Sequence, residues 1–129
     1  MTAAPRDGGG ALPERAERRA MDMALRTLDT AIEVIEVVRS MPTTVNVVAQ
    51  HDADLARQMR RALTSIPLNI AEGERRWNGN GRQRFETAMG SANEVVACLR
   101  VADAMGYVVI DAKLLDALDK IARTLRRLA

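Results

Sequence analysis

Four separate segments of the sequence repeat apolar residues at intervals of three and four, the spacing of one face of an α-helix. The β-branched run at Thr43, Thr44, Val45, Val47 and Val48 is too short and isolated to build a sheet. Because short segments connect the four helical segments, the simplest fold is an all-α, antiparallel up-and-down four-helix bundle. The four series are Met21, Leu25, Leu28, Ile32 and Ile35; Leu55, Met59, Leu63, Ile66 and Ile70; Phe85, Ala88, Ala92, Val95, Leu99 and Ala102; and Leu114, Leu118, Ile121, Leu125 and Leu128.

Length and composition favour a single helical domain. The chain has 129 residues, which suits one domain with a real core. Hydrophobic residues make up 47% of the chain, but only Phe85, Trp77 and Tyr107 are aromatic, so the core must be aliphatic. Residues 1–12 are rich in Gly, Ala and Pro and lack a helical period, so we expect a disordered leader before a domain over residues 13–129.

Capping residues place the helix boundaries. Asp52 and Asp111 can each cap the start of a helix, and Gly73 and Gly106 can each end one. With these caps counted, the predicted helices run over about 13–40, 52–73, 80–105 and 111–128. The β-branched segment Met41–His51 is interpreted as a connector that covers one end of the bundle. Three arginines suit the negative end of the last helix dipole: Arg123, Arg126 and Arg127.

Pro67 interrupts the second helical pattern. It cannot donate to the carbonyl of Leu63, which costs about 3 kcal/mol in a helix interior. Either the helix stops at Ile66, or it kinks and continues. We expect it to continue, because Ile66 and Ile70 lie one turn apart on the same face. Side chains that could satisfy the freed carbonyl are Thr64, Ser65 and Asn69.

Positive charge is concentrated in the middle of the chain. The formal net charge is only +2, but 17 of the 19 basic residues are arginine. Residues 57–100 hold eight arginines and four glutamates, a local charge of +4. Residues 1–56 carry nine acids and six bases, a local charge of −3. The middle segment is therefore the candidate for contact with a polyanion, the alternative being a solvated helical face.

The candidate nucleic-acid-binding residues come from this middle segment. Arginines would contact phosphates, and the indole of Trp77 would stack on an exposed base. Trp77 could instead cover the end of the core or a subunit contact. The candidates are Arg57, Arg60, Arg61, Arg75, Arg76, Trp77, Arg82 and Arg84.

The sequence contains no pattern that indicates catalysis or metal binding. His51 is the only histidine and Cys98 the only cysteine, so zinc patterns and a Glu-x-x-His motif are absent. No phosphate-binding Gly-x-x-x-x-Gly-Lys loop occurs either. We expect a protein that is not an enzyme, without metal, cofactor or small-molecule substrate. With no apolar stretch that could span a membrane, a cytoplasmic location is expected.

Small and acidic residues mark the third predicted helix. The triplet Gly90, Ser91 and Ala92 predicts close approach of a neighbouring helix. Glu94 and Glu72 could position Arg60 or Arg61, or form ordinary salt bridges within the bundle or between subunits.

Two stretches carry a family resemblance. "QMRRALTSIPLNIAEGERR" (58–76) and "RFETAMGSANEVVACLRVADAMGY" (84–107) resemble the bacterial four-helix bundle family first associated with 23S rRNA intervening sequences. That family is related to the accessory variability determinant of diversity-generating retroelements. The likeness covers roughly 21–128, with Met105 and the "WNGNG" link as departures. Its motif positions with structural roles are Ser65, Pro67, Asn69, Glu72, Gly73, Gly90, Ser91 and Glu94.

The resemblance implies a ring-shaped homopentamer without enzymatic activity. In retroelement relatives such a ring presents a basic surface to nucleic acid and associates with a reverse transcriptase. The small residues at 90–92 and a kink at Pro67 would then taper the protomer for packing around an axis. Two functions follow as hypotheses: a nucleic-acid-binding ring for RNA or DNA, or a homo-oligomeric protein-interaction scaffold without nucleic-acid binding.

Overall fold

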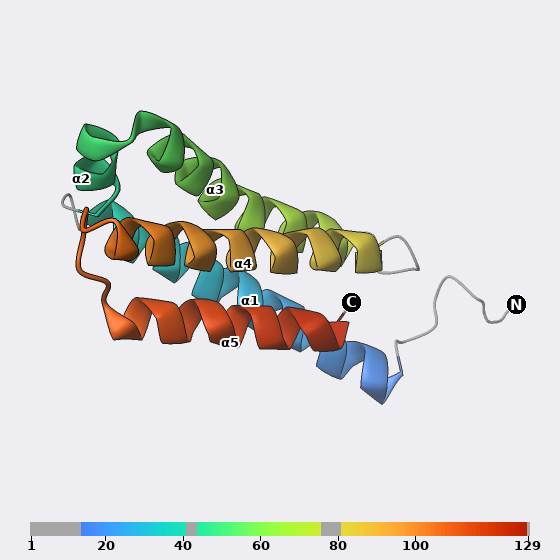
Figure 1. Ribbon diagram of the computed structural model, residues 1–129. Coiled ribbons are helices and arrows are strands. Elements are labelled where there is room, and N and C mark those ends of the chain that lie inside the picture. The colour runs from blue at the N-terminus through green and yellow to red at the C-terminus, as the bar shows by residue number, and fades with distance from the viewer. Residues whose placement is uncertain (1–13, 41–43, 76–80, 129) are drawn as a thin grey trace, which may run out of the picture.

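The computed structural model describes residues 14–40, 44–75 and 81–128, which form five α-helices and no strand (Figure 1). The prediction of an all-helical fold is confirmed over these residues. The predicted leader (1–12) and the "WNGNG" link with Trp77 lie outside them. The helices are α1 (Arg15–Ser40), α2 (Thr44–His51), α3 (Ala53–Arg75), α4 (Gly81–Ala104) and α5 (Ala112–Leu128).

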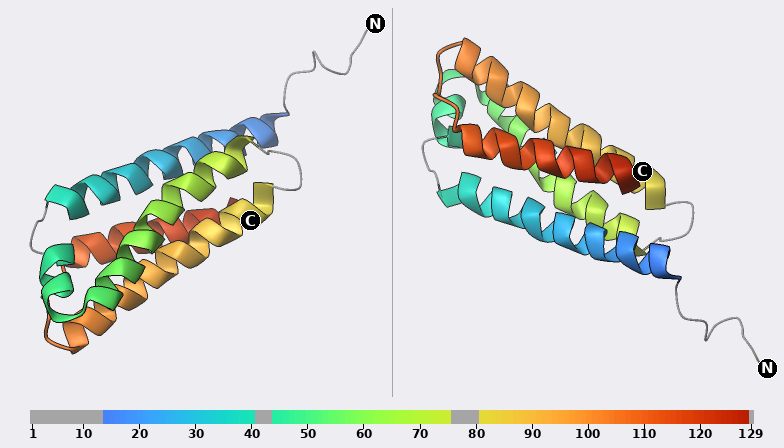
Figure 2. Two further views of the ribbon diagram at one scale, coloured as in Figure 1. Left: turned by 90° about the horizontal axis from the view of Figure 1, so that it is seen from above. Right: turned by 90° about the horizontal axis from the view of Figure 1, so that it is seen from below.

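The four long helices lie side by side, and neighbours run in opposite directions (Figures 1 and 2). Each contacts two others: α4 packs against α3 and α5, and α1 packs against the same two helices. The contact between α3 and α4 is the most extensive, so the two motif-bearing helices form the best-packed pair. Among the described helices, none is both long and apolar enough to cross a bilayer.

The segment predicted as a connector forms the short helix α2. Val45, Val48 and Ala49 fall at i, i+3 and i+4, and this face turns towards the core, with Val48 fully buried. Burial of this face outweighs the modest helix propensity of β-branched residues. The predicted connector is therefore helical over Thr44–His51, and it covers the end of the molecule where α3 begins (Figure 1).

The predicted caps explain where α3, α4 and α5 begin or end. The Oδ1 atom of Asp52 accepts a hydrogen bond from the Leu55 amide at 3.0 Å, and that of Asp111 accepts one from the Lys113 amide at 2.9 Å. Gly106 follows α4 with φ of 78°. The Tyr107 amide donates to the Ala102 carbonyl at 2.8 Å, and the Gly106 amide to the Asp103 carbonyl at 2.9 Å, which together form a Schellman motif.

The core is built from the apolar series predicted for α3, α4 and α5. All of these side chains are buried except Leu55, which is half-buried. On α4 the buried face alternates large and small residues, so Phe85 and Leu99 are separated by Ala88, Ala92 and Val95. The small side chains allow the backbones of α3 and α4 to approach, which accounts for their extensive contact.

The prediction for α1 is confirmed only in part. Met21, Leu25 and Ile32 remain 37%, 49% and 42% exposed, whereas Thr27 and Ala31 are buried. The apolar stripe of α1 is wider than the surface that α3 and α5 cover. Leu28 and Ile35, from the same predicted series, are half-buried and pack against the core, so only part of the stripe is left on the flank of α1.

α3 continues through Pro67 to Arg75, so the helix does not stop at Ile66. The proposed side-chain donors do not reach the Leu63 carbonyl. The Thr64 hydroxyl donates to the carbonyls of Arg60 and Arg61, at 3.2 and 3.1 Å, and the Asn69 amide donates to the Ser65 carbonyl at 2.8 Å. These side chains therefore support the helix on either side of Pro67 instead of at the carbonyl that Pro67 frees.

Candidate nucleic-acid interface

The candidate arginines lie on the outer faces of α3 and α4. Arg57, Arg60 and Arg61 are exposed in the first half of α3, and Arg82 and Arg84 are exposed in the first turn of α4. Arg75 is the last residue of α3. Its side chain lies outside the described part of the structure, as do Arg76 and Trp77.

The register of α3 and α4 separates these arginines into two groups. The Ser91 hydroxyl donates to the Ser65 hydroxyl at 2.8 Å, which sets the two antiparallel helices level at these residues. Seven residues further in each direction, Arg84 lies level with Glu72. Glu72 follows Arg61 by eleven residues, or about 16 Å of helix. The structure therefore places the two groups towards opposite ends of α3 instead of in one patch.

Most of the described candidate arginines have no internal partner. Arg57 pairs with Asp54 one turn earlier on α3. Both side chains are exposed, so this pair contributes little stability. Within residues 14–40, 44–75 and 81–128, no ion pair is found for Arg60, Arg61, Arg82 or Arg84. Their guanidinium groups are available to an external anion.

An open groove of about 350 Å³ runs between α3 and α4. Arg61 from α3 and Glu94 from α4 both line it, but they form no ion pair with each other. The predicted pairing of Glu94 with Arg60 or Arg61 is therefore not found. The lining residues all fall within the two quoted stretches: Gln58, Arg61, Ala62, Ser65, Ser91 and Glu94.

A small hydrogen-bond network closes the floor of this groove. The Ser65 hydroxyl accepts from Ser91 at 2.8 Å and from the Asn69 amide at 2.9 Å. Ser91 is buried, and Ser65 and Asn69 are half-buried. These three motif residues therefore join α4 to α3 by hydrogen bonds between their side chains.

Cys98 lies one turn beyond Glu94 on α4. Burial, and secondarily the charge of Glu94, raises the pKa of the Cys98 thiol. The thiol therefore stays protonated at neutral pH and is a poor nucleophile. Among the described residues, no group of three or more His, Cys, Asp or Glu side chains is placed to hold a metal ion.

The two motif glycines have different surroundings. A Cβ atom at Gly73 would lie 2.6 Å from the buried ring of Phe85, so Gly73 allows α3 to approach α4 and does not cap α3. Gly90 is exposed, and nothing described beyond its own helix lies within 4 Å of such an atom. Ser91 and Ala92 are buried within the chain. The prediction of a close helix approach at Gly90 is therefore wrong within this chain.

Glu74 is the half-buried acid at the end of α3. Burial, and secondarily the negative charge of Asp29 on α1, raises the pKa of its carboxyl group. Glu72, two residues earlier on α3, is also half-buried. The end of α3 therefore carries two carboxylates that are partly removed from solvent.

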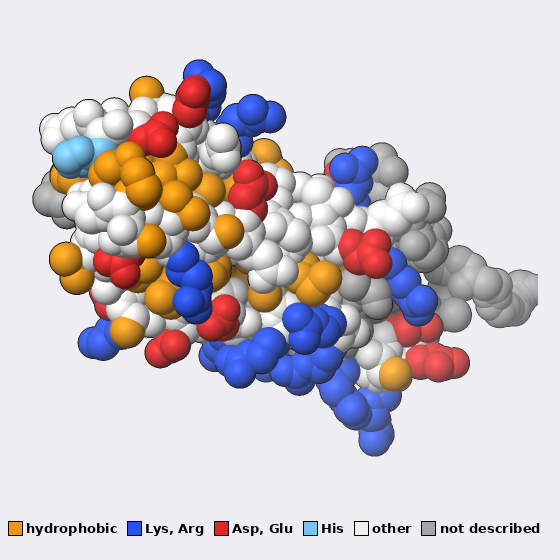
Figure 3. Space-filling view, in the orientation of Figure 1, with side chains coloured by type: hydrophobic (Ala, Val, Ile, Leu, Met, Phe, Trp, Pro, Cys, Tyr) orange, Lys and Arg blue, Asp and Glu red, His pale blue; other side chains and the backbone are white. Residues whose placement is uncertain are grey.

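A second group of cations lies at the end of α5, for which the sequence predicted only an interaction with the helix dipole. Arg123, Arg126 and Arg127 are all exposed at the C-terminal end of α5. Figure 3 shows Lys and Arg side chains gathered over this end of α5 and the adjoining start of α1. The signal available in the sequence was a run of nine residues, 120–128, with four cations and no acid.

Comparison with known proteins identifies the family. The family model described as 23S rRNA-intervening sequence protein matches residues 19–128, which include α2 to α5 and most of α1. Neither a curated protein nor a solved structure matches the chain significantly. The match covers far more than half of the sequence, including both motif stretches on α3 and α4, and the chain therefore belongs to the 23S rRNA-intervening sequence protein family.

Proposed function

We propose that this protein is a non-enzymatic, nucleic-acid-binding protein that contacts the phosphate backbone of RNA or DNA through arginines of α3 and α4. One observation carries the proposal. Arg60, Arg61, Arg82 and Arg84 are exposed, and none forms an ion pair with another described residue. A guanidinium group without an internal partner is suited to bidentate contact with phosphate.

The separation of the two arginine groups favours an extended ligand. A compact anion would touch only one group, because the groups lie about 16 Å apart along α3. A nucleic-acid backbone presents phosphates over such a distance. The description of the matched family refers to an intervening sequence of 23S rRNA, which makes structured RNA the first ligand to test.

The proposal includes assembly of the chain, as an antiparallel up-and-down four-helix bundle, into a ring-shaped homopentamer. Exposed apolar side chains support self-association: Met21, Leu25 and Ile32 on α1, Val101 on α4, and Met105 directly after α4. Large apolar side chains left uncovered in this way are typical of interaction surfaces. The number of subunits comes from the family resemblance alone.

A protein-interaction scaffold is the second candidate function. Val109 is 95% exposed, and Met105 is exposed nearby at the end of α4, so this end offers apolar contacts to a partner protein. A reverse transcriptase is the partner that the family resemblance suggests. In this alternative the arginines would serve only solubility and subunit contacts, and nucleic acid would not bind.

Light scattering combined with a salt titration of binding tests the proposal. We expect a mass near five protomers, and affinity for structured RNA and duplex DNA that falls steeply as salt rises. R60E/R61E should reduce the affinity and lower the slope of log K against log salt by about two for each protomer in contact. R100E/K113E reverses the same number of exposed charges elsewhere and serves as the control.

Two results would contradict the proposal. Wild-type protein of the expected mass that binds no nucleic acid at low salt would favour the scaffold. A loss of binding that is equal in R60E/R61E and in R100E/K113E would show that net charge, and not the α3 surface, determines affinity.

A further inference from the structure

We propose that the C-terminal turns of α5 form a second surface for a nucleic-acid backbone, centred on Arg123, Arg126 and Arg127 and separate from the α3–α4 arginines. We call these three residues the α5 arginine triad. The inference rests on the proposed function, since it names a further contact of the same ligand class. It adds a face of the protein to which neither the family motif nor the middle basic segment extends.

The triad lies together on the solvent face of α5. Arg126 and Arg127 follow Arg123 by three and four residues, so their Cβ atoms are about 5–6 Å apart on one helix face. All three side chains are exposed, whereas Leu125 and Leu128 between and beyond them are buried. The helix therefore directs its apolar side to the core and three guanidinium groups to solvent.

The helix dipole explains only part of this arrangement. Cations near a helix C-terminus are stabilising, but the effect falls off within the last turn. Arg123 lies before that turn, and like charges at i, i+4 repel each other. No described carboxylate forms an ion pair with any triad member. The repulsion within the triad is unrelieved in the protein, as expected for a surface that binds an anion.

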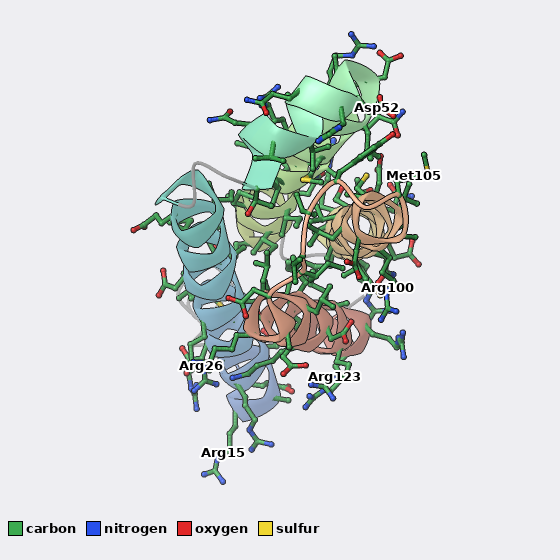
Figure 4. All side chains as sticks on the ribbon, turned by 60° about the vertical axis from the view of Figure 1, so that its left-hand side comes forward. Arg15, Arg26, Asp52, Arg100, Met105 and Arg123 are labelled. Carbon is green, nitrogen blue, oxygen red and sulfur yellow. The ribbon has the colours of Figure 1, made fainter. Side chains whose placement is uncertain are left out.

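The neighbouring helix extends the basic surface. The start of α1 lies beside the end of α5, as the ribbon views show (Figures 1 and 2). Arg15 of α1 and Arg123 of α5 extend on the same lower side of the molecule in Figure 4. The acids Asp116 and Asp119 stand earlier on α5, and the start of α1 carries the exposed acids Glu14 and Glu17 as well as arginines, so the surface without acids is confined to the C-terminal turns of α5.

The chemistry of this face favours nucleic acid over a partner protein. Protein interfaces are anchored by buried aromatic or aliphatic side chains surrounded by polar ones. The exposed positions of α5 hold no large apolar residue: they are Ala112, Lys113, Asp116, Asp119, Lys120, Arg123, Arg126 and Arg127. Arginine forks without an apolar anchor suit a phosphodiester backbone, which they contact in pairs.

The triad and the α3 arginines cannot both contact one straight stretch of a nucleic-acid backbone. α3 and α5 are not among the closely contacting helix pairs; each packs instead on α1 and α4. Their solvent faces therefore point in different directions (Figure 2). The protein would contact nucleic acid on two sides, either by holding two segments or by having one folded RNA wrap around it.

The test uses the full chain, a structured RNA hairpin and a salt titration. R123Q/R127Q removes two triad charges, and R100Q/K113Q removes two exposed charges elsewhere. We expect R123Q/R127Q to weaken RNA binding more than the control and to lower the salt slope by about two for each protomer in contact. When R123Q/R127Q and R60E/R61E are combined in one protein, their losses in log affinity should add, because the two surfaces are separate. Circular dichroism checks folding, and R126Q, with an expected slope change of about one, replaces the double variant if that variant unfolds.

The outcomes separate this inference from the proposed function. If wild-type protein binds RNA and R123Q/R127Q matches R100Q/K113Q, the second surface is wrong and the α3–α4 interface stands. If wild-type protein does not bind at low salt, both proposals fail. If R123Q/R127Q loses binding to poly-glutamate as strongly as to RNA, the surface recognises acidic chains in general and the assignment to a nucleic-acid backbone is overturned.

Discussion

Ser91 on α4 donates a hydrogen bond to Ser65 on α3 across 2.8 Å, 26 residues apart in the sequence. The same Ser65 oxygen accepts the Asn69 amide at 2.9 Å. The hydroxyl of Ser65 thus receives one donor from each of the two motif-bearing helices. This junction ties the register of α3 and α4 to specific polar atoms instead of to apolar packing alone.

Removing the shared acceptor, Ser65, should lower the free energy of unfolding more than removing one donor, Ser91. S91A loses one hydrogen bond, which is worth about 1 kcal/mol. S65A leaves two donors, on Ser91 and Asn69, without this acceptor, and should lower the free energy of unfolding by about 1–3 kcal/mol. T87A, which removes an exposed hydroxyl on α4, is the control. Urea denaturation measures the order, and an S65A protein as stable as wild type would refute a stabilising role for the junction.

The same substitution at the two motif glycines should have opposite effects. G73A places a methyl group against the buried Phe85 ring, and should destabilise the protein by about 1–3 kcal/mol. G90A meets open space on an exposed helix face, and should stabilise the protein by up to about 1 kcal/mol. Thermal unfolding compares them. If G90A instead breaks the assembly seen by light scattering, Gly90 belongs to a subunit contact.

The raised pKa of the Glu74 carboxyl group predicts that ionised Glu74 lowers the stability of the protein, and that this effect depends on pH. Because the folded-state pKa lies above the unfolded value, near 4.5, the folded protein holds more protons between the two values, and stability falls as pH rises through that window. E74Q should therefore raise the melting temperature at pH 7, and its advantage should disappear below pH 4.5. E86Q, at an exposed position of α4, is the control. An E74Q gain that is constant between pH 4 and 7 would exclude this origin.

The rings of His51 and Tyr107 hold α2 against the loop that follows α4. They stack with centroids 4.8 Å apart and an interplanar angle of 6°. Such pairs contribute about 0.5–1.5 kcal/mol beyond area burial. Y107A should accelerate amide exchange in α2, whereas Y107F, which keeps the ring, should behave like wild type. Equal exchange rates in both variants would show that the apolar face of α2, and not the ring stack, holds this helix.

Local features of the sequence were sufficient for much of the helical framework. The buried faces of α3, α4 and α5 follow from apolar spacing, and Asp52, Asp111 and Gly106 mark boundaries that the hydrogen bonds confirm. These predictions succeed because capping and one-sided burial depend on residues within a turn or two of one another. The continuation of α3 through Pro67 follows in the same way, from Ile66 and Ile70 on one face.

Other features depended on packing between helices, which no local pattern contains. α1 turned Ala31 to the core and left Met21, Leu25 and Ile32 partly exposed, because its neighbours cover only part of a wide apolar stripe. Gly73 proved to be a contact with Phe85 instead of a cap. The basic residues were visible in the sequence, but their division into separate surfaces was not. Helix periodicity sets which side of a helix a residue occupies, whereas only the crossing and register of neighbouring helices decide what that side meets.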